Sequence, residues 1–239
     1  MQRVAVIGGG PAGLMAADVL SQAGIAVEIY DAMPSLGRKF LLAGIGGMNI
    51  THAEDFDHFV TRYGDRSADL MPLLQQFGAG QLREWIHALG VETFVGTSGR
   101  VFPREMKAAP LLRKWLHRLR EAGVKIHTRH RWLGWKDGQL LFGTTGCEKT
   151  VKTDAVVLAL GGASWPVLGS DGAWFQLLKE KNVSLAPLCP SNCGFDVQWS
   201  HFFAGKFAGS PLKHVAVNGR VGECVVTGTG IEGSLVYAM

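Results

Sequence analysis

The stretch that decides the fold reads RVAVIGGGPAGLMAADVLSQAGIAVEIYD and covers residues 3–31. Residues 3–7 form a short apolar run that stops at glycine, which is typical of a buried parallel strand. Residues 11–23 place apolar side chains at helical spacing, and Gly24 supplies the stop signal. Residues 26–30 form a second apolar run. The pattern therefore predicts a right-handed βαβ unit.

The turn between the first strand and the helix has the G-x-G-x-x-G spacing, as Gly8, Gly10 and Gly13. After a strand and before a helix, this spacing predicts a dinucleotide site. Gly8 permits the tight turn, Gly10 lets a pyrophosphate approach the backbone, and Gly13 lets the helix pack on the strand. The helix opens with Pro11 and Ala12, and its free N–H groups and dipole would stabilise the diphosphate. A glycine-rich turn of an unrelated α/β protein is the alternative, which this context disfavours.

An acidic residue, Asp31, ends the second strand. Its carboxylate can accept hydrogen bonds from the hydroxyls of an adenosine ribose. Its negative charge should repel a 2′-phosphate, so the sequence argues against NADP in this site.

Further elements follow along the chain. Three short strands are predicted between two parallel strands, where a nicotinamide dehydrogenase usually has a helix, so we expect a β-meander connection. We expect an α/β, three-layer Rossmann-like domain over residues 1–186 and an incomplete β-rich inserted domain over 187–239. The other predicted segments are a glycine-rich loop at 37–49, helical regions at 69–89 and 110–122, and strands at 124–128, 131–136, 139–143, 148–153 and 154–160.

The composition is that of a globular protein. In 239 residues, 47% are hydrophobic and 18% are charged, which excludes a disordered chain. No apolar run is long enough to span a bilayer, and the N-terminus lacks the features of a secretory signal. The four cysteines are too few and too scattered for a disulfide framework. We therefore expect a cytoplasmic protein.

The sequence resembles the flavoproteins with two dinucleotide-binding domains, and more closely the bacterial NAD(P)/FAD-dependent oxidoreductases of the YhiN/BaiN-like group. The resemblance implies that the first glycine turn holds the ADP half of FAD. It also implies a flavin-dependent oxidoreductase whose flavin N5 takes a hydride from a reduced donor, for which NAD(P)H is a candidate, and passes electrons to an unknown acceptor. The matching segments are residues 8–13, 36–40, 43–51, 99–103 and 158–166.

The sequence departs from that group in two places. Many members read GGGRCN where residues 44–49 read GIGGMN, so no role can be transferred from the missing arginine and cysteine. Members are also considerably longer, and their chain returns after the inserted domain to complete the flavin site. On this comparison we expect the present sequence to stop inside the inserted domain, to bind FAD poorly by itself and to be inactive.

Other candidate residues lie in loops. Arg38 and Lys39 follow the second strand and could meet the diphosphate, and Gly161 and Gly162 resemble a second glycine turn beside the cofactor. Asn49 lies in a polar loop expected near the carboxyl ends of the strands. Solvated loops and an ordinary turn are the alternatives. The candidate cofactor-binding residues are Gly8, Gly10, Pro11, Ala12, Gly13, Asp31, Arg38, Lys39, Gly46, Gly47, Asn49, Gly161 and Gly162. No catalytic side chain can be named, and no metal site is expected.

Two alternative functions stay open at this point. One is an NAD-dependent dehydrogenase, which the meander disfavours, and the other is a truncated, non-catalytic dinucleotide-binding remnant. Cys189 and Cys193 could form a redox dithiol, although their spacing fits incidental thiols better. The basic face of residues 113–120 could bind nucleic acid, but a solvated helix surface explains it better at a net charge of +4.

Overall fold

The structure is a computed structural model that describes residues 2–43 and 47–239. The chain divides into two units, Met1–Leu185 and Ala186–Met239. The strands of the first unit are β1 (Arg3–Ile7), β2 (Ala26–Tyr30), β3 (Thr51–His52), β4 (Thr93–Val95), β5 (Arg100–Pro103), β6 (Lys125–His127), β7 (Arg131–Lys136), β8 (Gln139–Gly143), β9 (Glu148–Val151) and β10 (Ala155–Leu158). Its helices are α1 (Pro11–Gln22), α2 (Arg38–Leu42), α3 (Phe56–Thr61), α4 (Ser67–Gln76), α5 (Ala79–Ala88), α6 (Ala108–Glu121) and α7 (Trp174–Lys179), with 3₁₀ turns at Gly64–Arg66 and Pro166–Leu168.

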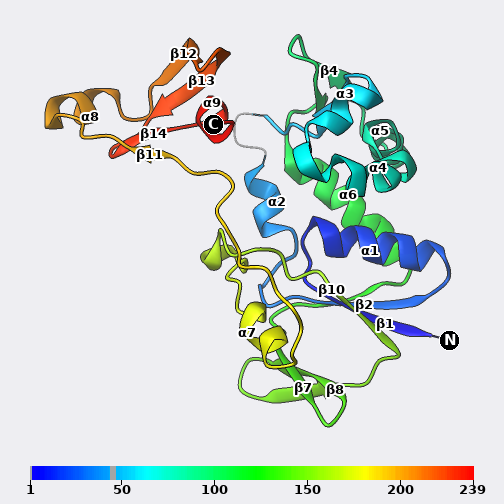
Figure 1. Cartoon of the computed structure of the whole chain (residues 1–239). Helices are drawn as coiled ribbons and strands as arrows, with labels where there is room; N and C mark the ends of the chain where they lie inside the picture. The colour runs from blue at the N-terminus through cyan, green and yellow to red at the C-terminus, as the bar shows by residue number, and fades with distance from the viewer. Residues whose placement is uncertain (1, 44–46) are drawn as a thin grey trace. The chain divides into compact units, whose positions relative to one another are not determined.

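A parallel sheet with the strand order β10-β1-β2-β6 forms the centre of the first unit. Helices α1 and α6 lie on one side of it, and β7 and β8 of the antiparallel meander β7-β8-β9 lie on the other (Figure 1). Alternate side chains of β1 serve the two faces: Val6 packs with the helices, whereas Ile7 packs with the meander. The predicted βαβ unit and the meander connection are both confirmed, and with them the predicted fold class.

A buried carboxylate fixes α1 to its neighbours. Asp18 is 1% exposed. It accepts hydrogen bonds from Trp85 Nε1 of α5 at 2.9 Å and from Gln22 Nε2 at 2.8 Å, and it pairs with Arg118 of α6. A buried charge is tolerated only when it is paired and hydrogen-bonded in this way. The network holds the helix that follows the first glycine turn in one place.

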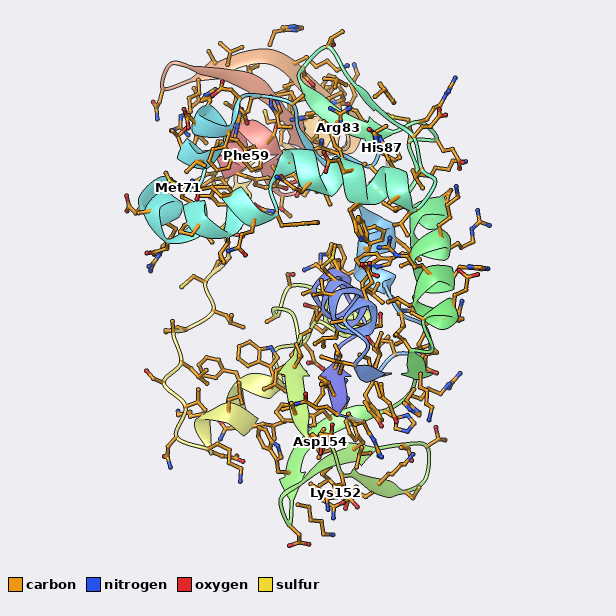
Figure 2. All side chains as sticks on the ribbon, turned by 90° about the vertical axis from the view of Figure 1, so that its right-hand side faces the viewer. Phe59, Met71, Arg83, His87, Lys152 and Asp154 are labelled. Carbon is orange, nitrogen blue, oxygen red and sulfur yellow. The ribbon has the colours of Figure 1, made fainter. Side chains whose placement is uncertain are left out.

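At the amino-terminal ends of the strands, side-chain hydrogen bonds join the start of β10 to the start of β1. Asp154, labelled in Figure 2, accepts the backbone N–H of Arg3 at 2.7 Å. Strand β10 begins at Ala155, one residue later than predicted, and ends at Leu158 rather than at residue 160. The N–H of Ala159 still donates to Ile7 of β1 at 2.8 Å, and residues 160–162 leave the sheet as a turn.

A small antiparallel sheet, β3-β5-β4, lies in the same unit together with α3, α4 and α5. His87 of α5 contacts the hydroxyl of Thr93 on β4 at 2.8 Å, and His87 is also marked in Figure 2. The helical region predicted at 69–89 is two helices, because Gly78 interrupts it and caps α5. The loop predicted at 37–49 contains helix α2, whose sequence RKFLL consists of good helix formers.

The second unit is a small mixed structure. Its strands pair antiparallel in the order β11-β14-β13-β12, as expected for β-rich sequence, but two short helices accompany them. The elements are β11 (Phe195–Asp196), α8 (His201–Phe207), β12 (Pro211–Val217), β13 (Arg220–Val226), β14 (Gly230–Glu232) and α9 (Ser234–Tyr237). Among the described residues, no helix has both the length and the apolar character that crossing a membrane requires.

Candidate functional site

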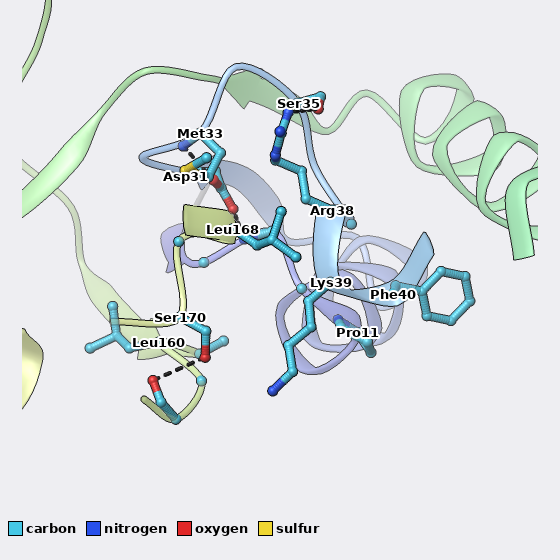
Figure 3. Close-up of a pocket in the computed structure, with 18 of the residues that line it drawn as sticks. Pro11, Asp31, Met33, Ser35, Arg38, Lys39, Phe40, Leu160, Leu168 and Ser170 are labelled. Carbon is cyan, nitrogen blue, oxygen red and sulfur yellow. Dashed lines mark hydrogen bonds between the residues drawn. The ribbon is translucent and has the colours of Figure 1, made fainter. Parts of the chain in front are cut away.

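A cavity of about 390 Å³ lies at the carboxyl ends of β1, β2 and β10 (Figure 3). Its size is within the range of small-molecule sites, and this edge of a parallel sheet is where α/β proteins bind ligands. Three chain segments line it: the glycine turn after β1, the segment from Asp31 to α2, and the turn after β10. The candidate residues that it brings together are Gly8, Gly10, Pro11, Asp31, Arg38, Lys39, Gly161 and Gly162.

The first glycine turn owes its shape to close backbone packing. A Cβ on Gly13 would lie 1.8 Å from the carbonyl oxygen of Gly8, and a Cβ on Gly8 would lie 2.2 Å from that of Ala159. Gly8 also has a φ of 108°, which other residues rarely adopt. A Cβ on Gly10, in contrast, would meet no atom within 4 Å. The protein's own packing therefore requires glycine at Gly8 and Gly13 but not at Gly10.

Helix α1 begins at this turn with unused hydrogen-bond donors. Gly10 is its N-cap and Pro11 its first residue, and Leu14 is the first residue whose N–H bonds back, to Gly10, at 2.9 Å. The N–H groups of Ala12 and Gly13 have no backbone partner among residues 2–43 and 47–239. Ala12 and Gly13 do not themselves line the cavity. The start of α1 nevertheless offers free N–H groups and the positive end of the helix dipole to an anion.

Asp31 joins the first turn to the segment that follows β2. Its carboxylate accepts the N–H of Gly9 at 2.6 Å and the N–H of Met33 at 2.7 Å, one on each oxygen. Asp31 is half-buried at the cavity wall. A carboxylate can accept about four hydrogen bonds, so each oxygen keeps capacity for a ligand donor.

Two cations from α2 line the cavity. Gly37 is left-handed at φ 67°, which turns the chain into the helix, and its N–H donates to Gly9 at 2.8 Å. Lys39 Nζ donates to Ser164 Oγ at 2.7 Å. The Nε of Arg38 is buried and has no hydrogen-bond partner in the described part of the chain. The Nη1 of Arg38 donates to Ser35 Oγ at 3.4 Å, so the guanidinium is oriented toward that hydroxyl.

The second glycine turn is held by side chains rather than by packing. Gly161, with φ 69°, and Gly162 both line the cavity. The carbonyl of Gly161 accepts from Trp174 Nε1 at 3.0 Å, and that of Gly162 accepts from Ser170 Oγ at 3.0 Å. Figure 3 shows Ser170 and its hydrogen bond at the edge of the cavity.

Two candidate residues from the glycine-rich loop, Gly47 and Asn49, are not part of this cavity. Asn49 is exposed, and its amide donates to the carbonyls of Thr51 and Val101, at 2.8 and 3.2 Å. Gly47 has a φ of 127° and lies against Met106. Gly46 lies outside the described residues. Asn49 thus helps to hold β3 on β5 in the structure.

The basic residues of α6 and the cysteines Cys189 and Cys193, which the sequence also offered as candidates, do not line the cavity. On the basic face of α6, Lys114 donates to the carbonyl of Gly90, His117 lies 3.1 Å from Glu121, and Arg118 pairs with Asp18. Cys189 and Cys193 are exposed free thiols. These contacts account for much of the basic face by helix capping and local ion pairing.

Several residues that line the cavity were not predicted from the sequence. They are Met33, Ser35, Phe40, Leu168 and Ser170, which lie in segments of no fixed spacing from the glycine motif. A second turn signal, Gly169 before Ser170, could have pointed to the last two. Nothing in the sequence alone could have shown that Trp174 reaches back to Gly161.

One titratable cluster supports the first turn from the meander side of the sheet. Tyr30 donates its hydroxyl to Glu28 at 2.8 Å and stacks between His127 and Phe142, with ring centres 4.5 Å away on each side. Burial raises the pKa of Tyr30 well above its usual value, and the bond to Glu28 adds to the rise. Burial alone would raise the pKa of Glu28, but hydrogen bonds from Tyr30 and His127 hold that pKa below its usual value. The carbonyl of Tyr30 accepts the N–H of Gly8 at 2.8 Å.

A parallel sheet, a meander and a glycine turn at a helix start together define a Rossmann-like dinucleotide-binding protein. The chain belongs to the HI0933-like protein Rossmann domain family, whose model matches residues 2–236. This is a family of flavoprotein oxidoreductases, so the resemblance found in the sequence is confirmed.

One curated relative is the 3-dehydro-bile acid delta(4,6)-reductase of Clostridium scindens, which is 30% identical over 246 residues. The match covers 99% of this chain but 59% of the relative. The chain thus spans about three fifths of the length of that protein.

Two solved structures share the fold. A 3-ketosteroid-delta4-(5alpha)-dehydrogenase from Rhodococcus jostii RHA1 matches with a TM-score of 0.52 and 15% identity, over 69% of this chain and 47% of its own. A flavocytochrome c3 fumarate reductase matches with a TM-score of 0.53 and 20% identity, over 67% and 34%. At these identities the likeness is one of fold.

Proposed function

We propose that this cavity is the family's FAD site, with the ADP half of the dinucleotide on the first glycine turn, and that the chain by itself holds FAD through that half and therefore weakly. The observation that carries the proposal is the open space at Gly10. A Cβ there would meet no protein atom within 4 Å, whereas a Cβ at Gly8 or Gly13 would collide with the backbone. Packing therefore does not require glycine at Gly10, but a ligand that approaches its backbone would require it.

The charges around the cavity suit a diphosphate. The start of α1 offers free N–H groups, and Arg38 and Lys39 line the same cavity. The positive charges of these two side chains would pair with the phosphate oxygens, and charge-assisted hydrogen bonds of this kind are the stronger ones. Asp31 suits the ribose, because its oxygens are already oriented by Gly9 and Met33 and keep free lone pairs.

When bound, FAD supplies the redox chemistry, in which a hydride is taken up from a reduced donor, with NAD(P)H the candidate, and electrons pass to an acceptor. The part of this chain is to bind and orient the dinucleotide. Asp31 holds the ribose, the start of α1 and the cations of α2 hold the diphosphate, and the second glycine turn bounds the cavity. Residues 1–186 act in this proposal as the FAD-binding domain, and 187–239 as part of a β-rich inserted domain.

For the whole protein we propose the reduction of a carbon–carbon double bond conjugated to a carbonyl. The support is the 30% identical relative, which is named as a delta(4,6)-reductase of a 3-dehydro bile acid. A reducing, cytoplasmic location belongs to the same proposal, since Cys147, Cys189, Cys193 and Cys224 are free thiols.

Titration calorimetry with ADP, AMP and FAD tests the binding proposal directly. We expect ADP to bind about tenfold or more tightly than AMP, because only ADP carries the diphosphate that the start of α1 would hold. The matched control is Gly10→Val, which should remove the preference for ADP. Equal binding of ADP and AMP, or no binding of either, would contradict the site.

A further inference from the structure

The turn after β10 contains a peptide group whose orientation is set from outside the cavity. The carbonyl of Gly161 accepts a hydrogen bond from Trp174 Nε1 at 3.0 Å, and Trp174 does not line the cavity. In a trans peptide, the C=O of one residue and the N–H of the next point in opposite directions. No cis peptide occurs in the described residues. The N–H of Gly162 is therefore turned away from Trp174, toward the cavity side.

That N–H is available to a ligand. Gly162 lines the cavity, and its N–H makes no hydrogen bond within residues 2–43 and 47–239. The next carbonyl, that of Gly162, is held by the hydroxyl of Ser170, which is 7% exposed. Consecutive peptide groups of the turn are thus each tied by one side chain. A turn with a left-handed glycine would otherwise have considerable freedom.

Trp174 is itself firmly placed. Its ring packs against the buried cluster of Trp132, Leu140 and Phe142 on the meander side of the sheet. The segment before it is tied to β7, because Asp171 pairs with Arg131 at 2.8 Å and accepts the N–H of Ala173 at 3.1 Å. The indole donor is therefore fixed by the core before any ligand arrives.

We propose that Trp174, assisted by Ser170, is a positioning residue that presents the N–H of Gly162 to an acceptor atom of the bound dinucleotide. The inference rests on the proposed FAD site. Trp174 acts through the peptide group alone, so the effect of its removal should appear as a mobile turn in the ligand-free chain and as weaker binding in the complex.

The variants Trp174→Phe and Ser170→Ala each remove one of the two hydrogen bonds and keep most of the side chain. Trp132→Phe is the matched control, because Trp132 belongs to the same cluster and its indole N–H is buried without a partner. All three are compared with the parent by ¹⁵N relaxation of the glycine amides without ligand, and by calorimetry with FAD and ADP.

We expect Trp174→Phe to lower the order parameters of Gly161 and Gly162 from rigid values, about 0.85, to below about 0.7. It should also weaken FAD binding about three- to tenfold, the effect of one hydrogen bond. Ser170→Ala should act in the same direction, and Trp132→Phe should do neither.

Unchanged order parameters in both Trp174→Phe and Ser170→Ala would overturn the inference, as would FAD affinity within twofold of the Trp132→Phe control. Failure of the proposed function has a different signature: the parent itself would bind neither ADP nor FAD. In that case the relaxation data still decide whether Trp174 fixes the turn, and the presentation of Gly162 to a dinucleotide is rejected.

Discussion

The two glycine turns of the cavity are built in different ways. The first, after β1, is shaped by backbone against backbone: the carbonyl of Ala159 leaves no room for a Cβ on Gly8, and the carbonyl of Gly8 leaves none on Gly13. The second, after β10, has ample room: a Cβ on Gly161 would approach only Ser170 Oγ, at 3.5 Å, and one on Gly162 would meet nothing within 4 Å. Hydrogen bonds from Ser170 and Trp174 fix it instead.

The difference separates two means of holding a ligand-binding turn. A turn fixed by close packing is rigid, but only glycine can occupy its close-packed positions. A turn fixed by side-chain hydrogen bonds tolerates substitution where its backbone is not left-handed, as at Gly162 but not at Gly161, and it depends on residues elsewhere. The first turn should therefore be sensitive to changes at its own glycines, and the second to changes at its supports.

The largest effect is expected from Gly13→Ala. The new Cβ would lie 1.8 Å from the carbonyl oxygen of Gly8, which is backbone and cannot move aside without shifting β1 or α1. We expect a loss of about 3 kcal/mol or more in the free energy of unfolding, measured by urea denaturation. Gly162→Ala is the control from the second turn and should cost less than about 1 kcal/mol. Similar losses for the two variants would remove the distinction between the turns.

The next effect concerns Gly10, which belongs to the first turn but lies in open space. Gly10→Val should lower stability by only about 1 kcal/mol, since valine is a poor N-cap, and yet abolish measurable ADP binding. The measurements are a urea titration and calorimetry on the same preparation. A variant that binds ADP like the parent would show that the diphosphate does not approach this backbone.

The sequence was sufficient to predict the first turn and its surroundings. Steric requirements can be recognised in a sequence, because the packing at Gly8 and Gly13 leaves no room for a Cβ and the spacing of these glycines to the helix is fixed. Both faces of β1 and β2 are buried, one against the helices and the other against the meander, so each strand is a mostly apolar run in the sequence. Strand, turn, helix and meander were all found for this reason.

The supports of the second turn could not be found in the same way. Trp174 lies 13 positions beyond Gly161, and the contact depends on how α7 packs on the meander. The bond between Lys39 and Ser164 spans 125 positions. Such pairs follow from tertiary structure and leave no local pattern. The position of Asn49 has the same origin, since its amide donates to Thr51 and Val101 and the residue does not line the cavity.

A smaller effect is expected at Asp31, which serves both the turn and the ligand. Asp31→Ala removes the acceptor of the Gly9 and Met33 N–H groups as well as that of the ribose hydroxyls. Hydrogen bonds to a charged group contribute about 1.5–3 kcal/mol, so ADP affinity should fall about tenfold or more in calorimetry. Asp31→Asn keeps one acceptor oxygen and should lie between parent and alanine variant. No change in affinity in either variant would contradict the ribose role.

The smallest effect is a dependence on pH that should distinguish the two turns. The first turn rests on Tyr30, whose carbonyl holds the N–H of Gly8 and whose hydroxyl donates to Glu28. The second rests on Ser170 and Trp174, whose hydroxyl and indole do not titrate in the acid range. Asp171, which pairs with Arg131 beside Trp174, does titrate: burial alone would raise its pKa, but hydrogen bonds from Ala173 and Arg131 hold that pKa below its usual value of 3.8. Acid should therefore begin to loosen the support of the first turn at a higher pH than that of the second.

The direction of this pH dependence follows from the ionisation of Glu28. Hydrogen bonds from Tyr30 and His127 outweigh burial and hold the pKa of Glu28 below its usual value of 4.5, so ionised Glu28 stabilises the folded chain. That contribution is complete above the usual pKa and is lost as the pH falls through the lower value of the folded chain. We expect hydrogen exchange at the Gly8 amide to accelerate relative to the Trp174 indole between about pH 6 and pH 3.5. In Glu28→Gln the two sites should keep a constant ratio, because the variant cannot ionise. If the ratio changes equally in the variant and the parent, Glu28 is not the source of the acid sensitivity of the first turn.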